Sequence, residues 1–152
     1  MRRHSLTGFL RRHKRIGLDT GVFIFQLEQN PKYIELVHSV FQWLEEPSSF
    51  GATSTVTMLE LLVRPYRRSD IDTVNRCYAL ASTYPNLHWV DLTLPVADEA
   101  ARLRGEFNLK TPDAIQAASI LALQATGFIS NDPVFRRLQN LDILILDDLL
   151  LP

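Results

Sequence analysis

Five short strand-like segments alternate with helix-like segments along this 152-residue chain, and no other feature limits its possible folds as much. Apolar residues recur at helical spacing in the helix-like segments, whereas the strand-like segments are short apolar runs. We expect strands at 15–19, 49–54, 87–92, 127–131 and 142–148. We expect helices at 21–30, 33–46, 56–64, 71–84, 96–107 and 112–125, and a short helix from Pro133. This alternation predicts an α/β fold, in which helices cover both faces of a five-stranded parallel sheet.

Several helix boundaries are marked by single residues. Asp70 is expected to cap the helix at 71–84, and Pro65 is expected to stop the preceding helix. At the helix from 112, Thr111 would supply the capping hydroxyl, Pro112 would hold the first helical position and Asp113 would lie in the first turn. An acid there is favoured by the helix dipole, so ordinary capping could account for Asp113.

Composition indicates a single globular domain without a membrane segment. The chain is 46% hydrophobic and 22% charged, and it is long enough to bury a substantial core. No apolar run approaches the roughly 18 residues that span a bilayer, so we expect no membrane partner. A single cysteine, Cys77, excludes an internal disulfide framework and predicts a cytoplasmic protein.

Charge is unevenly distributed along the chain. The first 15 residues hold six Arg and Lys and no acid, which leaves ten basic against 17 acidic residues in the remainder. Such a basic arm could be a solvated tail, could contact phosphates, or could be a short targeting peptide. The remaining body is acidic, so the positions of its acids matter most.

Three acids fall where open parallel sheets form their sites, outside the carboxyl ends of the strands. Asp19 ends the first expected strand, Asp132 follows the fourth, and Asp113 opens the helix before that fourth strand. A further acid, Glu60, lies in the apolar segment 56–63, which an exposed helix face explains poorly. Each acid alone is also consistent with a cap or a surface charge, but together they predict a carboxylate cluster.

Clustered carboxylates repel one another, and their pKa values rise unless a cation neutralises them. Oxygen ligands of this kind suit Mg²⁺ or Mn²⁺ rather than zinc. An ion held by carboxylates lowers the pKa of a bound water and stabilises charge on a phosphate. The chemistry that these residues indicate is metal-assisted phosphodiester hydrolysis.

Four segments resemble, in order and spacing, the motifs of PIN domains, and of VapC-type toxins from bacterial toxin–antitoxin pairs in particular. They are "IGLDTGVFIFQLEQNPKY", "TSTVTMLELLV", "TPDAIQAASILA" and "FISNDPVFRRL". The resemblance implies a PIN-like domain over 15–152 with sheet order 3-2-1-4-5, and it leaves 1–14 as a basic N-terminal arm outside the family pattern. It also implies a metal-dependent ribonuclease that uses Mg²⁺ or Mn²⁺.

The resemblance also implies roles for individual residues. Asp19 and Asp113 would bind the metal directly, while Glu60 would orient a water on it. Asp132 would be the fourth acid. Supporting roles would fall to Thr20 and Ser130. Many relatives carry Asn after the Asp-Thr pair, where this chain has Gly21, so one supporting hydrogen bond is expected to be absent.

Expected partners also follow from the resemblance. They are an RNA substrate, a small VapB-like antitoxin bound across the acidic groove, and a second copy of the chain. The helix at 33–46 would offer apolar surface for pairing if Phe41, Trp43 and Leu44 are not all in the core. The candidate RNA-binding residues are Arg64, Arg67, Arg68, Arg136 and Arg137.

Other families with a similar architecture fit less well. A haloacid-dehalogenase-type phosphatase needs a second acid two residues after its first, where this chain has Gly21. A phosphoacceptor receiver domain needs a lysine late in the chain, and none follows Lys110. A catalytically degenerate PIN domain that only binds RNA or protein remains the open alternative.

Overall fold

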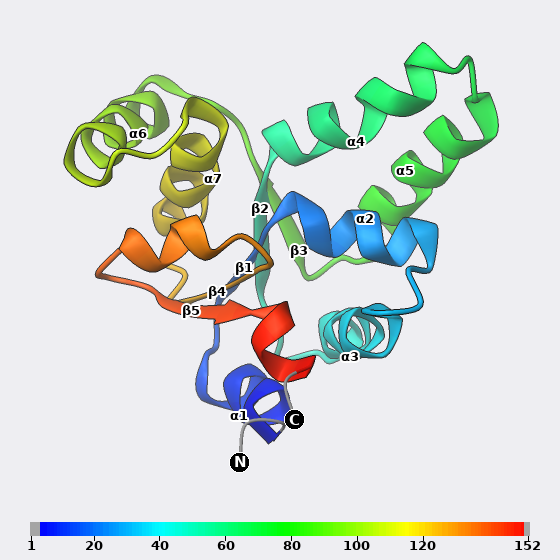
Figure 1. Cartoon of the computed structure of the whole chain (residues 1–152), viewed down its shortest axis with the longest axis horizontal. Helices are drawn as coiled ribbons and strands as arrows, with labels where there is room; N and C mark the ends of the chain where they lie inside the picture. The colour runs from blue at the N-terminus through cyan, green and yellow to red at the C-terminus, as the bar shows by residue number, and fades with distance from the viewer. Residues whose placement is uncertain (1–3, 151–152) are drawn as a thin grey trace.

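The computed structural model describes residues 4–150 and has a five-stranded parallel sheet at its centre (Figure 1). The strand order is β3-β2-β1-β4-β5, and each neighbouring pair is parallel. The strands are β1 Ile16–Leu18, β2 Gly51–Ser54, β3 Leu87–Val90, β4 Gly127–Ser130 and β5 Asp142–Ile145. The predicted sheet type and strand order are confirmed. The order reverses between β1 and β4, which makes their carboxyl ends the switch point of the sheet.

Helices cover both faces of this sheet (Figure 1). They are α1 His4–Arg12, α2 Thr20–Glu28, α3 Ile34–Glu45, α4 Thr55–Arg67, α5 Ile71–Thr83, α6 Leu94–Phe107 and α7 Thr111–Ala122, with 3₁₀ helices η1 Pro133–Arg137 and η2 Leu146–Leu150. Helices α6 and α7 lie on one face, and α2 to α5 on the other. Each face has its own apolar core, because alternate residues such as Phe128 and Ile129 of β4 point to opposite sides.

A glycine at the centre of β1 lets α7 approach the sheet closely. A Cβ atom at Gly17 would lie 2.4 Å from Ile120 Cδ1 of α7 and 2.8 Å from Phe128 Cδ1. Those distances are too short for any side chain, so Ile120 packs directly on the β1 backbone. This contact brings the helix that carries Asp113 against the strand that leads to Asp19.

The expectation that a helix ends before Pro65 is wrong, because α4 continues to Arg67. A proline inside a helix leaves the carbonyl four residues earlier without its N–H donor, here the carbonyl of Leu61. The Cys77 thiol of α5 donates to this oxygen, with 3.9 Å between sulfur and oxygen. The neighbouring helix therefore satisfies the group that the proline leaves unpaired.

Two other boundaries also differ from expectation. Lys110, not Thr111, is the N-cap of α7, and its side chain makes no capping hydrogen bond. The last strand ends at Ile145 instead of continuing to 148, and η2 follows it. Hydrogen bonds hold this turn: Tyr33 Oη donates to Asp147 Oδ1 at 2.6 Å, and the Asp147 amide donates to Asn131 Oδ1 at 2.8 Å.

The basic N-terminal segment contributes to the core. Within α1, Leu6 and Phe9 are buried, and the helix packs against α3. Arg12 and His13 link α1 to Asp142 at the start of β5. Arg12 Nη2 lies 2.9 Å and His13 Nε2 lies 2.7 Å from Asp142 Oδ2. A solvated tail is therefore the wrong description of residues 4–12, while residues 1–3 lie outside the described part of the chain.

Apolar surface is found on a different helix from the one expected. Phe41, Trp43 and Leu44 of α3 are all buried, so α3 does not offer the predicted pairing surface. Instead, Leu59, Val63 and Tyr66 of α4 are 61%, 39% and 55% exposed and recur at helical spacing. Within residues 4–150, no helix is both long and apolar enough to span a membrane.

The packing of α1 can be tested by truncating Phe9. Phe9→Ala should lower the free energy of unfolding by about 3–5 kcal/mol, because a fully buried aromatic side chain leaves a cavity. Arg11→Ala on the same helix, where the side chain is exposed, should change it by less than about 0.5 kcal/mol. Denaturant titration measures both values. Equal effects would mean that α1 is not part of the core.

Candidate active site

Asp19 connects the end of β1 to the start of α2, at the switch point of the sheet. Its side chain caps α2 by accepting a hydrogen bond from the Thr20 amide at Oδ1, at 2.9 Å. Its own amide donates to the Ile129 carbonyl of β4 at 3.0 Å. The position of Asp19 is therefore fixed by both the helix and the neighbouring strand.

Two further side chains hold the partly buried Asp19 carboxylate. Ser130 Oγ donates to Oδ2 at 2.7 Å, and Gln116 Nε2 lies 3.4 Å from Oδ1. Burial raises the pKa of Asp19, and the charge of Glu60 adds to this, while the hydrogen bonds from Ser130, Thr20 and Gln116 lower it. Burial dominates, so the folded protein disfavours the charged form of this carboxyl.

Asp113 lies in the first turn of α7 and is half-buried. Burial raises the pKa of Asp113 to about 6, with further contributions from the charges of Asp19, Asp132 and Glu60. The ammonium group of Lys110 opposes this shift only weakly, as the smallest contribution. The four carboxylates thus share one negative region at the carboxyl edge of the sheet.

Glu60 reaches this region from the first half of α4. Thr20 Oγ1 donates to Glu60 Oε1 at 2.6 Å, which links the carboxylate to the residue that follows Asp19. The apolar neighbours of Glu60 led us to expect that an exposed helix face would explain it poorly. This expectation is wrong, because both Glu60 and Leu59 are exposed. The hydrogen bond to Thr20 fixes the position of Glu60.

Asp132 has a capping role as well as its place near Asp113. Its Oδ1 accepts a hydrogen bond from the Val134 amide at 3.0 Å, which caps η1. Its own amide donates to Ser130 Oγ at 3.0 Å, and this orients the Ser130 hydroxyl toward Asp19. Asp132 itself is exposed.

Sequence reasoning missed a buried polar network beneath Asp19. Gln116 of α7 contacts the Ser54 amide and Thr57 Oγ1, and Thr57 in turn contacts Thr53 Oγ1. Thr53 Oγ1 donates to the Leu18 carbonyl of β1 at 2.8 Å. The available signal was a glutamine in a helix whose neighbouring residues are almost all apolar.

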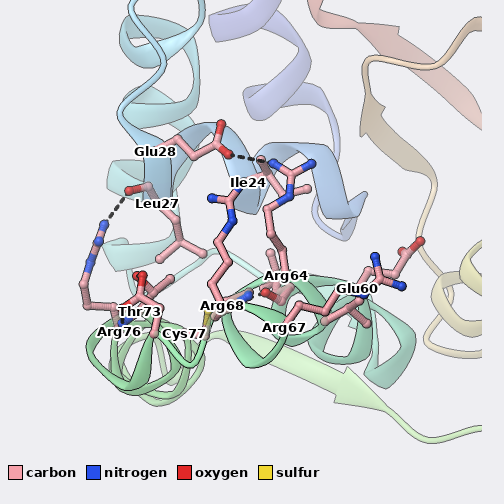
Figure 2. Close-up of a pocket in the computed structure, with 14 residues that line it drawn as sticks. Ile24, Leu27, Glu28, Glu60, Arg64, Arg67, Arg68, Thr73, Arg76 and Cys77 are labelled. Carbon is pink, nitrogen blue, oxygen red and sulfur yellow. Dashed lines mark hydrogen bonds and ion pairs between the residues drawn. The ribbon is translucent and has the colours of Figure 1, made fainter.

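The candidate RNA-binding arginines occupy two different environments. Arg64, Arg67 and Arg68 line a cavity of about 560 Å³ between α2, α4 and α5, which Glu60 also lines. Figure 2 shows Arg64 directed toward Glu28, and these side chains form an ion pair at 3.9 Å. On η1, Arg136 pairs with Asp148, while Arg137 donates to the Asn108 carbonyl at 2.9 Å. Arg64, Arg67 and Arg68 therefore share a cavity with Glu60, whereas the two arginines of η1 are paired with Asp148 and with the Asn108 carbonyl.

The carboxylates fit a small hard cation. In residues 4–150, no three acidic, histidine or cysteine side chains are grouped closely enough to hold an ion by themselves. Mg²⁺, however, binds proteins through one or two carboxylates and keeps several waters. Two carboxylates of one negative region, such as those of Asp19 and Asp113, would be such a donor set. At Gly21, an added Cβ would meet no atom within 4 Å, so the space for a larger side chain is open.

The chain was compared with known families, proteins and structures. The model of the PIN domain matches residues 16–141, which is most of the chain. A search of curated proteins found no matching relative.

Several solved structures have the same fold at low sequence identity. VapBC2 from Rickettsia felis, bound to a promoter DNA fragment, has a TM-score of 0.64 and 18% identity, covering 86% of this chain and 98% of that one. A toxin–antitoxin complex from Klebsiella pneumoniae has a TM-score of 0.63 and 17% identity, covering 86% and 97%. DNA-bound VapBC from Salmonella typhimurium has a TM-score of 0.61 and 19% identity, covering 87% and 98%. The fold agrees with these structures, and the match over residues 16–141 shows that the chain belongs to the PIN domain family.

Proposed function

We propose that this protein is an endoribonuclease that depends on Mg²⁺ or Mn²⁺, and that it is the VapC-type toxin of a toxin–antitoxin pair. The observation that supports this most is the fixed position of the Asp19 carboxylate at the switch point, where it accepts hydrogen bonds from Ser130 and the Thr20 amide, while the charges of Asp19, Asp132 and Glu60 all act on Asp113. A site that gathers negative charge in this way is suited to a cation and a phosphate.

Each acid has a distinct task in this proposal. Asp19 and Asp113 hold the ion, and Ser130 keeps the Asp19 carboxylate in place. Glu60, held by Thr20, orients the attacking water, and Asp132 completes the negative region. When bound, the ion supplies a lowered water pKa and stabilises charge on the scissile phosphate.

The alternative function is a binding module without catalytic activity. Gly21 favours it, because the side chain that many relatives carry there is missing and nothing fills its space. All four acids remain, however, and Ser130 and Thr20 make the hydrogen bonds that support two of them. We therefore prefer the enzyme.

The partners of the chain are part of the proposal. The similar solved structures are toxin–antitoxin complexes, which supports a VapB-like antitoxin that covers the acidic groove. RNA would contact Arg64, Arg67 and Arg68 beside Glu60, with Arg136 and Arg137 as additional contacts. Such a toxin would act on RNA in the cytoplasm.

We also propose that residues 1–14 are an addition to a PIN domain that spans 15–152, since the family match begins at residue 16. Arg11, His13 and Lys14 line a second cavity of about 730 Å³ between α1 and α3. These basic side chains could contact phosphates of a longer RNA.

A homodimer is the remaining part of the proposal. The apolar stripe Leu59, Val63 and Tyr66 on α4 would supply its contact surface, in place of α3.

Loss of a metal ligand tests the catalytic assignment. Asp113→Asn and Asp19→Asn should each abolish Mg²⁺-dependent RNA cleavage with the fold intact, because several kcal/mol of transition-state stabilisation would be lost. Asp98→Asn, an exposed acid on α6, should cleave RNA like the parent. Expression of the parent should also slow bacterial growth, and co-expression of the antitoxin should restore it. Expression of Asp113→Asn should leave growth unchanged. Cleavage by purified Asp113→Asn at the parent rate would refute the assignment.

Stability should depend on pH through Asp113. Its pKa is about 6 in the folded chain against an ordinary 3.8, so the folded state binds this proton more tightly. Its contribution to stability is therefore present below about pH 4 and is lost as the pH rises through about 6. Asp113→Asn has no carboxylate at this position and does not lose this contribution. With chelator present, its melting temperature should therefore rise relative to that of the parent between about pH 4 and pH 7.5.

Two comparisons accompany this measurement. The same difference for Asp98→Asn should stay flat, because that acid is exposed on α6. At neutral pH, Mn²⁺ should raise the melting temperature of the parent more than that of Asp113→Asn, since the ion binds only the folded site. A difference for Asp113→Asn that does not change with pH would mean that Asp113 lies outside a shared negative site.

The oligomeric state tests the α4 surface. The chain has a mass of 17.4 kDa, and light scattering of the parent should give twice that value. Leu59→Lys should give the monomer mass, because it places a charge at the most exposed apolar residue of the contact. Ile71→Lys, an exposed apolar residue on α5, serves as the control and should remain a dimer. A monomeric parent would exclude the proposed homodimer.

A further inference from the structure

The orientation of the Gln116 side-chain amide is determined by its neighbours. The Ser54 backbone N–H, which can only donate, points to Gln116 Oε1 at 2.9 Å. The amide nitrogen must therefore face the other way, toward Thr57 Oγ1 at 2.8 Å and Asp19 Oδ1 at 3.4 Å. Gln116 is 2% exposed, so water does not compete for these groups.

The hydroxyl groups next to Gln116 agree with this orientation. Thr53 Oγ1 uses its single hydrogen to donate to the Leu18 carbonyl, so its 2.8 Å contact with Thr57 requires Thr57 to donate. Thr20 Oγ1 also lies 3.1 Å from Thr57 Oγ1, but its hydrogen is donated to Glu60, so this contact gives Thr57 no further donor. Thr57 then has only acceptor capacity left for Gln116. One N–H of the amide is committed to Thr57, and the other is available for Asp19.

This network distinguishes the two oxygens of Asp19. A carboxylate has about four acceptor positions, two on each oxygen. Oδ1 accepts from the Thr20 amide and from Gln116, whereas Oδ2 accepts from Ser130 only. Oδ1 therefore has two donors, the second at 3.4 Å, whereas Oδ2 has one and keeps a free position for a cation.

We propose that Gln116 is a positioning residue of the ion site, which holds Asp19 Oδ1 and so leaves Asp19 Oδ2 as the oxygen that binds the cation. The inference extends the proposed function, because it rests on Asp19 as a metal ligand. It adds a buried residue that links the end of β2 and the first turn of α4 to this ligand. Only a side-chain amide can accept from Ser54 and donate to both Thr57 and Asp19.

The test is the affinity of the full chain for Mn²⁺, measured by electron paramagnetic resonance well below the melting temperature. Gln116→Met keeps a similar length and volume but removes the amide. It should weaken Mn²⁺ binding by about tenfold or more, as loss of a residue that orients a metal ligand does. If Gln116→Met does not fold, Gln116→Asn replaces it, because its shorter side chain cannot reach both Ser54 and Asp19.

Thr53→Val is the matched control for a merely structural effect. The Thr53 hydroxyl belongs to the same buried network, but its hydrogen-bond partners are Leu18 and Thr57 and not Asp19. This variant should lower the melting temperature yet keep the Mn²⁺ affinity of the parent. Parent-like affinity in Gln116→Met, or an equal loss in Thr53→Val, would overturn the role of Gln116 and leave the ion site standing. A parent that does not bind Mn²⁺ would instead overturn the ion site and this inference together.

Discussion

The close packing of α7 on β1 is the contact on which the site depends. Because position 17 has no side chain, Ile120 lies directly on the β1 backbone. The same approach places Gln116 beneath Asp19 and sets Asp113 beside it, one turn earlier on α7. A methyl group at Gly17 would separate the two elements and with them the two carboxylates. The arrangement of these carboxylates is thus a consequence of a packing requirement in the core.

The second requirement is electrostatic. Folding brings four acids to one edge of the sheet, and burial adds to their repulsion, as the raised pKa values of Asp19 and Asp113 show. Hydrogen bonds from Ser130 and Thr20 offset part of this cost without removing the charge. Two of these acids also cap helices, since Asp19 is the N-cap of α2 and Asp132 is the N-cap of η1. A cap and a site acid are therefore not alternatives for these two residues.

Much of the architecture could be predicted from the sequence, because alternation of strand and helix patterns is a local signal that the parallel sheet preserves. The predictions that failed depended on contacts between distant segments. Pro65 does not end α4, since the thiol of Cys77 supplies a donor. Phe41 and Trp43 are not exposed, since the core around α3 includes residues of α1. No local pattern contains this information.

The same holds for the site. Asp19 and Asp132 could be predicted to lie at the switch point because each lies at or just after a strand end, and Asp113 because it opens the helix before the fourth strand. Glu60 was expected in the site because a charge among apolar residues did not fit an exposed helix face. The Glu60 side chain is in fact exposed, and the hydrogen bond from Thr20 fixes its position. Gln116 could not be found, since its three partners come from distant segments: Ser54 at the end of β2, Thr57 in α4 and Asp19 at the N-cap of α2.

The contact between Cys77 and the Leu61 carbonyl also makes the chain's only thiol a probe of motion. The thiol is 1% exposed, and burial raises its pKa, so thiol reagents reach it slowly while α4 and α5 stay together. Its rate of alkylation therefore reports how often the α4–α5 hairpin opens. Because Glu60 is carried on α4, the same rate also measures fluctuations at the acidic edge of the sheet, without any added label.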